Sequence, residues 1–123
     1  MGETDFCTPL ILEYLNGRRW RLAQAFHYHS EVSKRTYHVP AGFVTDFASI
    51  PRFFWRVLPP TGEYGKAAVI HDNNYRVTTT VSQKMADDVF LEGMRDLNVP
   101  AWKALVMYWG VRAFGRWSYK GTL

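Results

Sequence analysis

A histidine and several carboxylates recur at helical spacing in the middle of the chain. In residues 67–75 (AAVIHDNNY), His71 and Tyr75 are i, i+4 neighbours on a helix, and two alanines precede the histidine by one turn. His71 is therefore expected on a face of small residues, which a second helix can approach closely. Asp72 points about 100° away from His71 around the same helix.

The helix expected next decides which of two neighbouring aspartates faces the core. Asp87 begins an apolar series at i, i+3, i+4 and i+7, which is completed by Phe90, Leu91 and Met94. Asp88 begins a polar series with Glu92, so we expect Asp88 to be exposed to solvent. A carboxylate aimed at the core is costly unless it is paired. Asp87 is therefore expected to have a polar partner inside the protein.

That partner is expected to be His71. If the connection between the helices centres near position 79, His71 and Asp87 are equidistant from it and meet across an antiparallel pair. Asp87 would accept a hydrogen bond from one ring nitrogen and leave the other as a base. Tyr75 would donate its hydroxyl to the same carboxylate, and Asp72 would hold a cation beside the histidine. The structural alternative is a pair that only satisfies two buried polar groups, with Asp72 bonded to Arg76 at i+4.

These residues resemble a known enzyme motif. The strings HDNNY at 71–75 and ADDVF at 86–90 resemble the His-Asp-x-x-Tyr and Asp-x-x-Phe elements of the phospholipase A2 superfamily. The resemblance is closest to the small disulfide-free versions in parvovirus capsid proteins. It implies that His71 is the catalytic base, that Asp87 orients it with support from Tyr75, and that Asp72 binds calcium.

The segment at residues 45–52 (TDFASIPR) is expected to complete the site. In the superfamily a glycine-rich loop supplies further calcium ligands, but residues 51–55 of this chain contain no glycine. Asp46 is therefore assigned as the replacement ligand, and Arg52 with Ser49 as the group that binds an anionic head group or phosphate. The structural alternative is that Asp46 and Ser49 cap the following helix and that Arg52 pairs with Asp46.

The chain as a whole resembles a family of short proteins encoded by bacteriophages and prophages. The resemblance is carried by residues 39–52 (VPAGFVTDFASIPR), by the motif at 71–75 and by residues 108–112 (YWGVR). It implies a phage origin, with synthesis in the host cytoplasm, and a place in the virion belongs to one of the alternatives that follow. Three functions stay open: a calcium-assisted ester hydrolase acting on phospholipid, a non-catalytic tail or neck component bound to other phage structural proteins, and an accessory protein acting against a host system.

Length and composition predict one domain over residues 1–123. Lys and Arg number 15 against 11 Asp and Glu, and this net charge of +4 permits an anionic partner without demanding one, so nucleic acid is not expected. A single cysteine excludes an internal disulfide. No apolar stretch approaches the roughly 18 residues of a membrane span, and the first residues do not read as a signal peptide, so we expect no export.

The periodicity changes once, near residue 45, and predicts an α+β fold. We expect a small N-terminal antiparallel β-sheet followed by a helical hairpin and a C-terminal helix. Alternation predicts strands at 10–15 and 20–28, joined by an Asn16-Gly17 turn, then a strand at 36–39 continued by 42–44. Cap residues and apolar spacing predict helices at 49–57, 66–76, 82–97 and 101–114.

Overall fold

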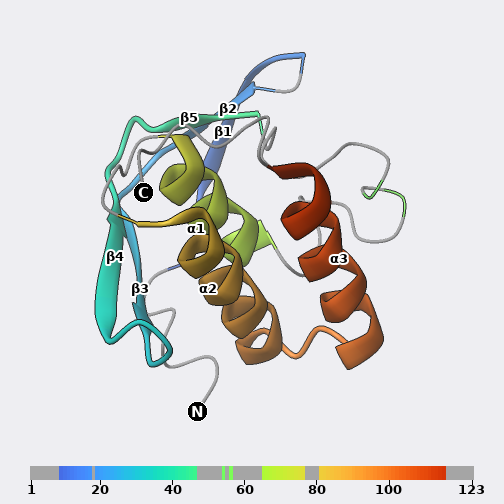
Figure 1. The fold of residues 1–123 in the computed structure, drawn as a ribbon. Helices are drawn as coiled ribbons and strands as arrows, with labels where there is room; N and C mark the ends of the chain where they lie inside the picture. Colours follow the sequence, from blue (N-terminus) through green and yellow to red (C-terminus); the bar gives the residue numbers. More distant parts are fainter. Residues whose placement is uncertain are drawn as a thin grey trace.

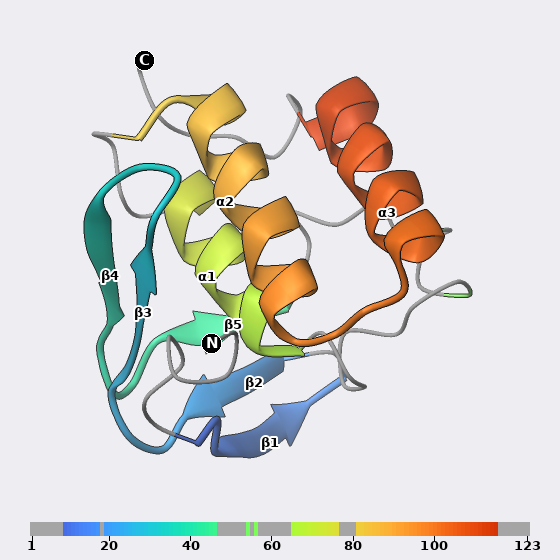
Figure 2. The same cartoon turned by 90° about the horizontal axis from the view of Figure 1, so that it is seen from below.

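The fold is α+β, as the sequence predicts. The computed structural model describes residues 9–17, 19–46, 54, 56, 65–76 and 81–115, and in this part of the chain five short strands precede three helices (Figure 1). The three helices lie side by side. One β-hairpin runs along one side of the helices, a second sheet lies across one end, and α3 lies on the opposite side from the hairpin (Figure 2).

The sheet at the end of the helices has the order β1-β2-β5. Strand β1 (Leu12–Asn16) pairs antiparallel with β2 (Arg19–Leu22) through the predicted turn, where Gly17 has a φ of 54° that favours glycine. Strand β5 (Val44–Thr45) pairs with the other edge of β2. This pairing brings Thr45 and the residue after it next to the helices.

The predicted single strand at 20–28 is wrong, because the chain bends at residues 23–25 and enters another sheet. Strand β3 (Phe26–Ser30) pairs with β4 (Arg35–Val39) in a separate two-stranded sheet. Leu22 and Phe26, on either side of the bend, are both buried. The bend lets β2 stay with β1 while β3 turns its apolar side toward the helices, an arrangement that alternation alone does not distinguish from one long strand.

The helices agree closely with the sequence prediction. Helix α1 spans Gly65–Arg76, α2 spans Gln83–Asp96 and α3 spans Ala101–Phe114. The predicted cap Ser82 accepts a hydrogen bond from the Met85 backbone N–H at 3.1 Å. The helix predicted at 49–57 lies outside the described residues, apart from positions 54 and 56.

Helix α1 forms the centre of the core. It packs against α2, and every residue of α1 is buried except Lys66 and Arg76. The β3–β4 hairpin is tied to α2 by Glu92, which accepts hydrogen bonds from the Ser30 hydroxyl at 2.6 Å and from two backbone N–H groups of the hairpin turn. No helix in the described part of the chain is long and apolar enough to cross a bilayer. Because α1 is almost entirely buried, its polar residues face other elements of the protein on all sides.

Candidate functional site

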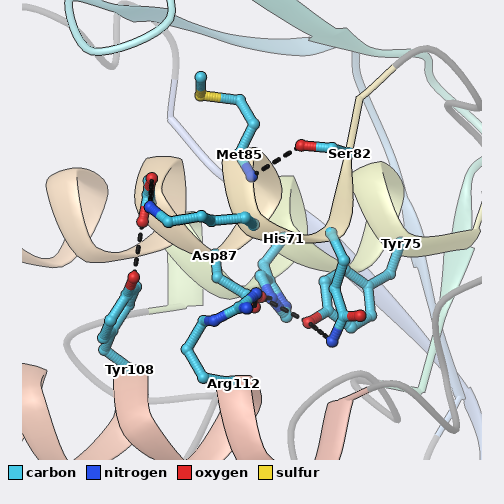
Figure 3. Close-up of polar contacts among 10 residues, drawn as sticks. His71, Tyr75, Ser82, Met85, Asp87, Tyr108 and Arg112 are labelled. Atoms are coloured by element: carbon cyan, nitrogen blue, oxygen red, sulfur yellow. Dashed lines mark hydrogen bonds and ion pairs between the residues drawn. The ribbon is translucent and has the colours of Figure 1, made fainter. Parts of the chain in front are cut away.

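His71 and Asp87 face each other across the α1–α2 hairpin, as their spacing predicts. Nε2 of His71 lies 2.7 Å from Oδ1 of Asp87, and both side chains have an exposed fraction of 0% (Figure 3). A carboxylate only accepts hydrogen bonds, so Nε2 carries the proton that the histidine donates. The ring also packs against Tyr75 and Phe90, with centroids 4.1 and 4.6 Å away. The ring is thus held by one hydrogen bond and two aromatic contacts.

The carboxylate of Asp87 is satisfied by two further donors. The Tyr75 hydroxyl donates to Oδ1 at 2.5 Å, and Arg112 of α3 donates from Nη1 to Oδ2 at 3.0 Å. Figure 3 shows Asp87 between these groups. Burial and the negative charge of Asp87 raise the pKa of the Tyr75 hydroxyl, so Tyr75 remains a donor. Three elements of the fold therefore meet at one buried carboxylate.

A glycine at the end of α3 leaves room for this arrangement. A Cβ added to Gly115 would overlap the hydroxyl of Tyr75. Gly110, one turn and a half earlier, similarly leaves room for the ring of Phe54, which would lie 2.6 Å from an added Cβ. The chain can approach Tyr75 at Gly115, and Phe54 at Gly110, because these two positions lack side chains.

Asp72 lies on the other side of α1, next to strand β5. Its exposed fraction is 0%, and its Oδ2 accepts a hydrogen bond from the Thr45 hydroxyl at 2.7 Å. Arg76 places Nη1 3.8 Å from the same oxygen and 2.8 Å from Oδ1 of Asp46. The structure thus brings Asp72 and Asp46 to one guanidinium, and the i, i+4 contact of the structural alternative is present. Ser49 and Arg52, the predicted anion-binding residues, lie outside the described residues.

The two predicted calcium ligands do not fit a calcium ion by themselves. Calcium takes six to eight oxygens at about 2.3–2.6 Å. Among the described residues no group of three or more His, Cys, Asp or Glu side chains is placed to hold a metal. The guanidinium of Arg76 provides the positive charge next to Asp46 and Asp72 instead. Calcium binding at Asp72 and Asp46 stays a prediction.

Asp88, expected to be exposed to solvent, is only partly exposed. Only 24% of its side chain is exposed, and it accepts hydrogen bonds from Tyr108 at 2.7 Å and from Lys84 at 2.8 Å. Helix α3 packs along this edge of α2, a contact that the periodicity of α2 alone does not reveal. Burial and the hydrogen bond to Asp88 raise the pKa of Tyr108 to about 12.

Helical spacing does not predict two important partners in this region. Arg112 reaches Asp87 from α3, and Thr45 reaches Asp72 from β5. One general signal was available, because a buried carboxylate normally needs a cation nearby. This rule predicts a cation near Asp87 but does not identify which arginine of the chain provides it.

Comparison with known proteins gives relatives but no activity. The chain is 45% identical over 82 residues to the "Uncharacterized protein y4jT" of Sinorhizobium fredii (strain NBRC 101917 / NGR234). The aligned part is 63% of this chain and 23% of y4jT, so the chain spans less than a quarter of that relative's length. No solved structure matches the chain. A family model described as "Protein of unknown function (DUF1353)" matches residues 20–111, which include His71, Asp72 and Asp87, and the chain therefore belongs to the DUF1353 family.

Proposed function

We propose that this protein is a phage- or prophage-encoded ester hydrolase in which His71 is the general base and Asp87 orients it. The observation that supports the proposal is the 2.7 Å contact between Nε2 of His71 and Oδ1 of Asp87, made by a carboxylate that Tyr75 and Arg112 also hold. A histidine fixed in this way has one defined tautomer and directs its second nitrogen away from the carboxylate.

The proposed reaction is hydrolysis by an activated water. Nδ1 of His71 removes a proton from water while the oxygen attacks the ester carbonyl and forms a tetrahedral intermediate. The imidazolium is stabilised by the negative charge of Asp87. The carbon–oxygen bond of the ester then breaks, and the leaving alcohol takes the proton back from Nδ1. The base is thus regenerated, and Arg112 and Tyr75 keep the carboxylate in place throughout.

The polar content of α1 also supports a functional site. His71, Asp72, Asn73 and Asn74 are consecutive, and each has an exposed fraction of 3% or less. Within the part of the chain that the structure describes, the side-chain amide of Asn74 has no hydrogen-bond partner at either polar atom. Burying polar groups costs free energy, and an unsatisfied buried group in a native protein calls for an explanation. A site that uses polar groups inside the protein is such an explanation.

The proposal requires water and substrate to reach His71. Both members of the pair have an exposed fraction of 0%, so the conformation described here is closed to solvent at this point. The proposed activity therefore includes an opening that uncovers the ring of His71. Calcium as an activating ion, with Asp72 and Asp46 as ligands, is part of the same prediction and is tested separately.

The test is hydrolysis of phosphatidylcholine vesicles and of a soluble p-nitrophenyl ester, each measured with calcium and with EDTA. We expect His71→Gln to remove hydrolysis while circular dichroism shows an intact fold. The matched control is His38→Gln, an exposed histidine on β4, which should keep the wild-type rate. Absence of hydrolysis by the folded wild-type protein under both conditions would overturn the enzyme proposal. Equal rates with calcium and with EDTA would overturn the calcium prediction alone.

A second candidate is a non-catalytic component of a phage tail or neck. Two observations favour it: the closed His71–Asp87 pair, and an apolar face on α3. Trp102 and Trp109 are 62% and 64% exposed, with Leu105 and Val106 between them on the same side of the helix. Exposed apolar patches are typical of surfaces that bind other proteins. On this alternative His71→Gln lowers stability, and the folded wild-type protein hydrolyses neither substrate.

A further inference from the structure

A surface cavity opens beside the C-terminal end of α1. Its volume is about 370 Å³, and it is lined by Arg19 of β2, Val44 of β5, Asp46 and Arg76, the last residue of α1. Such a volume falls within the range of small-molecule sites, about 300–1,000 Å³. The cavity thus lies where the β1-β2-β5 sheet meets the C-terminal end of α1.

The sheet register explains why two arginines meet at this cavity. Trp20 is paired with Thr45, so antiparallel pairing places Arg19 next to Asp46. Asp46 in turn accepts a hydrogen bond from Nη1 of Arg76 at 2.8 Å. Asp46 is therefore flanked by one arginine from the sheet and one from the helix.

The lining carries more positive than negative charge. It contains two guanidinium groups and one carboxylate. Among the described residues, no carboxylate lies within ion-pair distance of Arg19, which is exposed. Arg76 uses Nη1 for Asp46 and is 37% exposed, and a guanidinium has five N–H donors in all. Donors from both arginines are therefore available to a ligand in the cavity.

A second carboxylate, that of Asp72, also holds Arg76 in position. The buried Asp72 lies 3.8 Å from its Nη1, and Asp72 is itself fixed by the Thr45 hydroxyl. An arginine fixed by two carboxylates loses less conformational freedom when it binds a ligand, and the planar group suits two parallel hydrogen bonds to an oxyanion. The cavity thus combines the preorganised guanidinium of Arg76 with the exposed guanidinium of Arg19.

We propose that this cavity is a binding site for a phosphate group, held between Arg19 and Arg76. Phosphate matches the fork of donors that a guanidinium presents, and the two guanidinium groups together match the charge of about −1.5 to −2 that a phosphate monoester carries. The volume exceeds that of inorganic phosphate, and Val44 offers an apolar wall, so the ligand we infer is a small phosphate monoester. Neither His71 nor Asp87 lines the site, so the inference does not depend on whether His71 is catalytic.

The experiment is calorimetric titration of the full chain with glycerol 3-phosphate and, separately, with inorganic phosphate, at constant ionic strength. Saturable binding of glycerol 3-phosphate is expected, tighter than that of inorganic phosphate. Equal affinity would overturn the inference of a monoester and leave a site for free phosphate. Absence of saturable binding of either probe would overturn the site. Because no hydrolysis is measured, this outcome is separate from the outcome of the enzyme test.

Variants identify the cavity as the place of binding. Arg19→Gln should weaken binding about tenfold or more, the loss expected for a charge-assisted hydrogen bond. The matched control is Arg21→Gln on the same strand, because Arg21 is bonded to Glu13 at 2.8 Å and does not line the cavity. Arg76→Gln should weaken binding further. An equal affinity of the Arg19→Gln and Arg21→Gln proteins would overturn the assignment, and Arg19 is exposed, so this comparison does not depend on folding.

Discussion

Two buried aspartates, one facing α1 from α2 and one on α1 itself, are stabilised by the same kinds of group. Asp87 faces α1 from α2 and receives one hydroxyl, from Tyr75, and one guanidinium, from Arg112. A hydroxyl and a guanidinium satisfy a carboxylate inside a protein without leaving its charge unbalanced. Asp87 differs from Asp72 in having His71 as a third partner. His71 and Tyr75 both contact the same oxygen of Asp87, Oδ1.

Asp72 repeats this scheme toward the sheet, with Thr45 as the hydroxyl and Arg76 as the guanidinium. The difference lies in the surroundings of the arginine. Arg112 closes the His71 site from α3, whereas Arg76 lines a cavity that is open to solvent. The same pair of groups, a hydroxyl and a guanidinium, thus helps to fix a histidine at Asp87 and places an arginine beside a cavity at Asp72.

The largest expected effect comes from removing the two carboxylates in turn. Asp87→Ala leaves His71, Tyr75 and Arg112 without their acceptor in the core, so we expect a loss of about 3–5 kcal/mol of unfolding free energy. Asp72→Ala should cost less, about 1–3 kcal/mol, because Arg76 keeps its contact with Asp46. Urea denaturation measures both. A larger loss for Asp72→Ala would show that the sheet side carries more of the stability.

The next effect tests the closeness of α3 to the histidine site. Gly115→Ala puts a methyl group where the Tyr75 hydroxyl lies and should cost about 1–3 kcal/mol. The same substitution in a Tyr75→Phe background should cost less, since the hydroxyl that it displaces is gone. Thermal unfolding of the four proteins gives this coupling. Additive effects would mean that α3 adjusts without disturbing Asp87.

Local patterns predicted the parts of the molecule that depend on one element or one turn. Ser82 and Pro100 mark where α2 and α3 begin. The contact between His71 and Asp87 follows from helical spacing on two adjacent helices. Adjacent antiparallel helices meet in a simple register, so positions equidistant from their connection come together. The α1–α2 hairpin and its buried His71–Asp87 pair could therefore both be predicted from the sequence.

The parts that were missed depend on packing between distant segments. Arg112 and Thr45 reach their aspartates from elements far along the chain, and Tyr108 covers Asp88 from α3. Periodicity describes which side of a helix is apolar but not which neighbour covers its edge. The division of residues 20–28 between two sheets has the same origin, because Leu22 and Phe26 both enter the core although they lie on strands of different sheets.

The smallest expected effect concerns Asp88, which repeats the scheme at the surface with Tyr108 as the hydroxyl and Lys84 as the cation. Burial alone would raise the pKa of Asp88, but the hydrogen bonds from Lys84 and Tyr108 and the charge of Lys84 outweigh it and lower the pKa. The folded state therefore favours the ionised form. This contribution is complete above the unfolded pKa, about 3.9, and is lost as the pH falls through the lower folded value.

Asp88→Asn should therefore be less stable than the wild type at pH 7, by less than about 1 kcal/mol because the ion pair is partly exposed. The test is to measure the melting temperatures of the wild type and of Asp88→Asn between about pH 2 and pH 7. The difference between the two melting temperatures should narrow below about pH 4, because Asp88 takes up a proton there. Tyr108→Phe is the control, since it removes one of the hydrogen bonds that lower the pKa and should move the narrowing to higher pH. A gap that stays constant over the whole range would mean that Asp88 contributes through shape and not through charge, which would set it apart from Asp87 and Asp72.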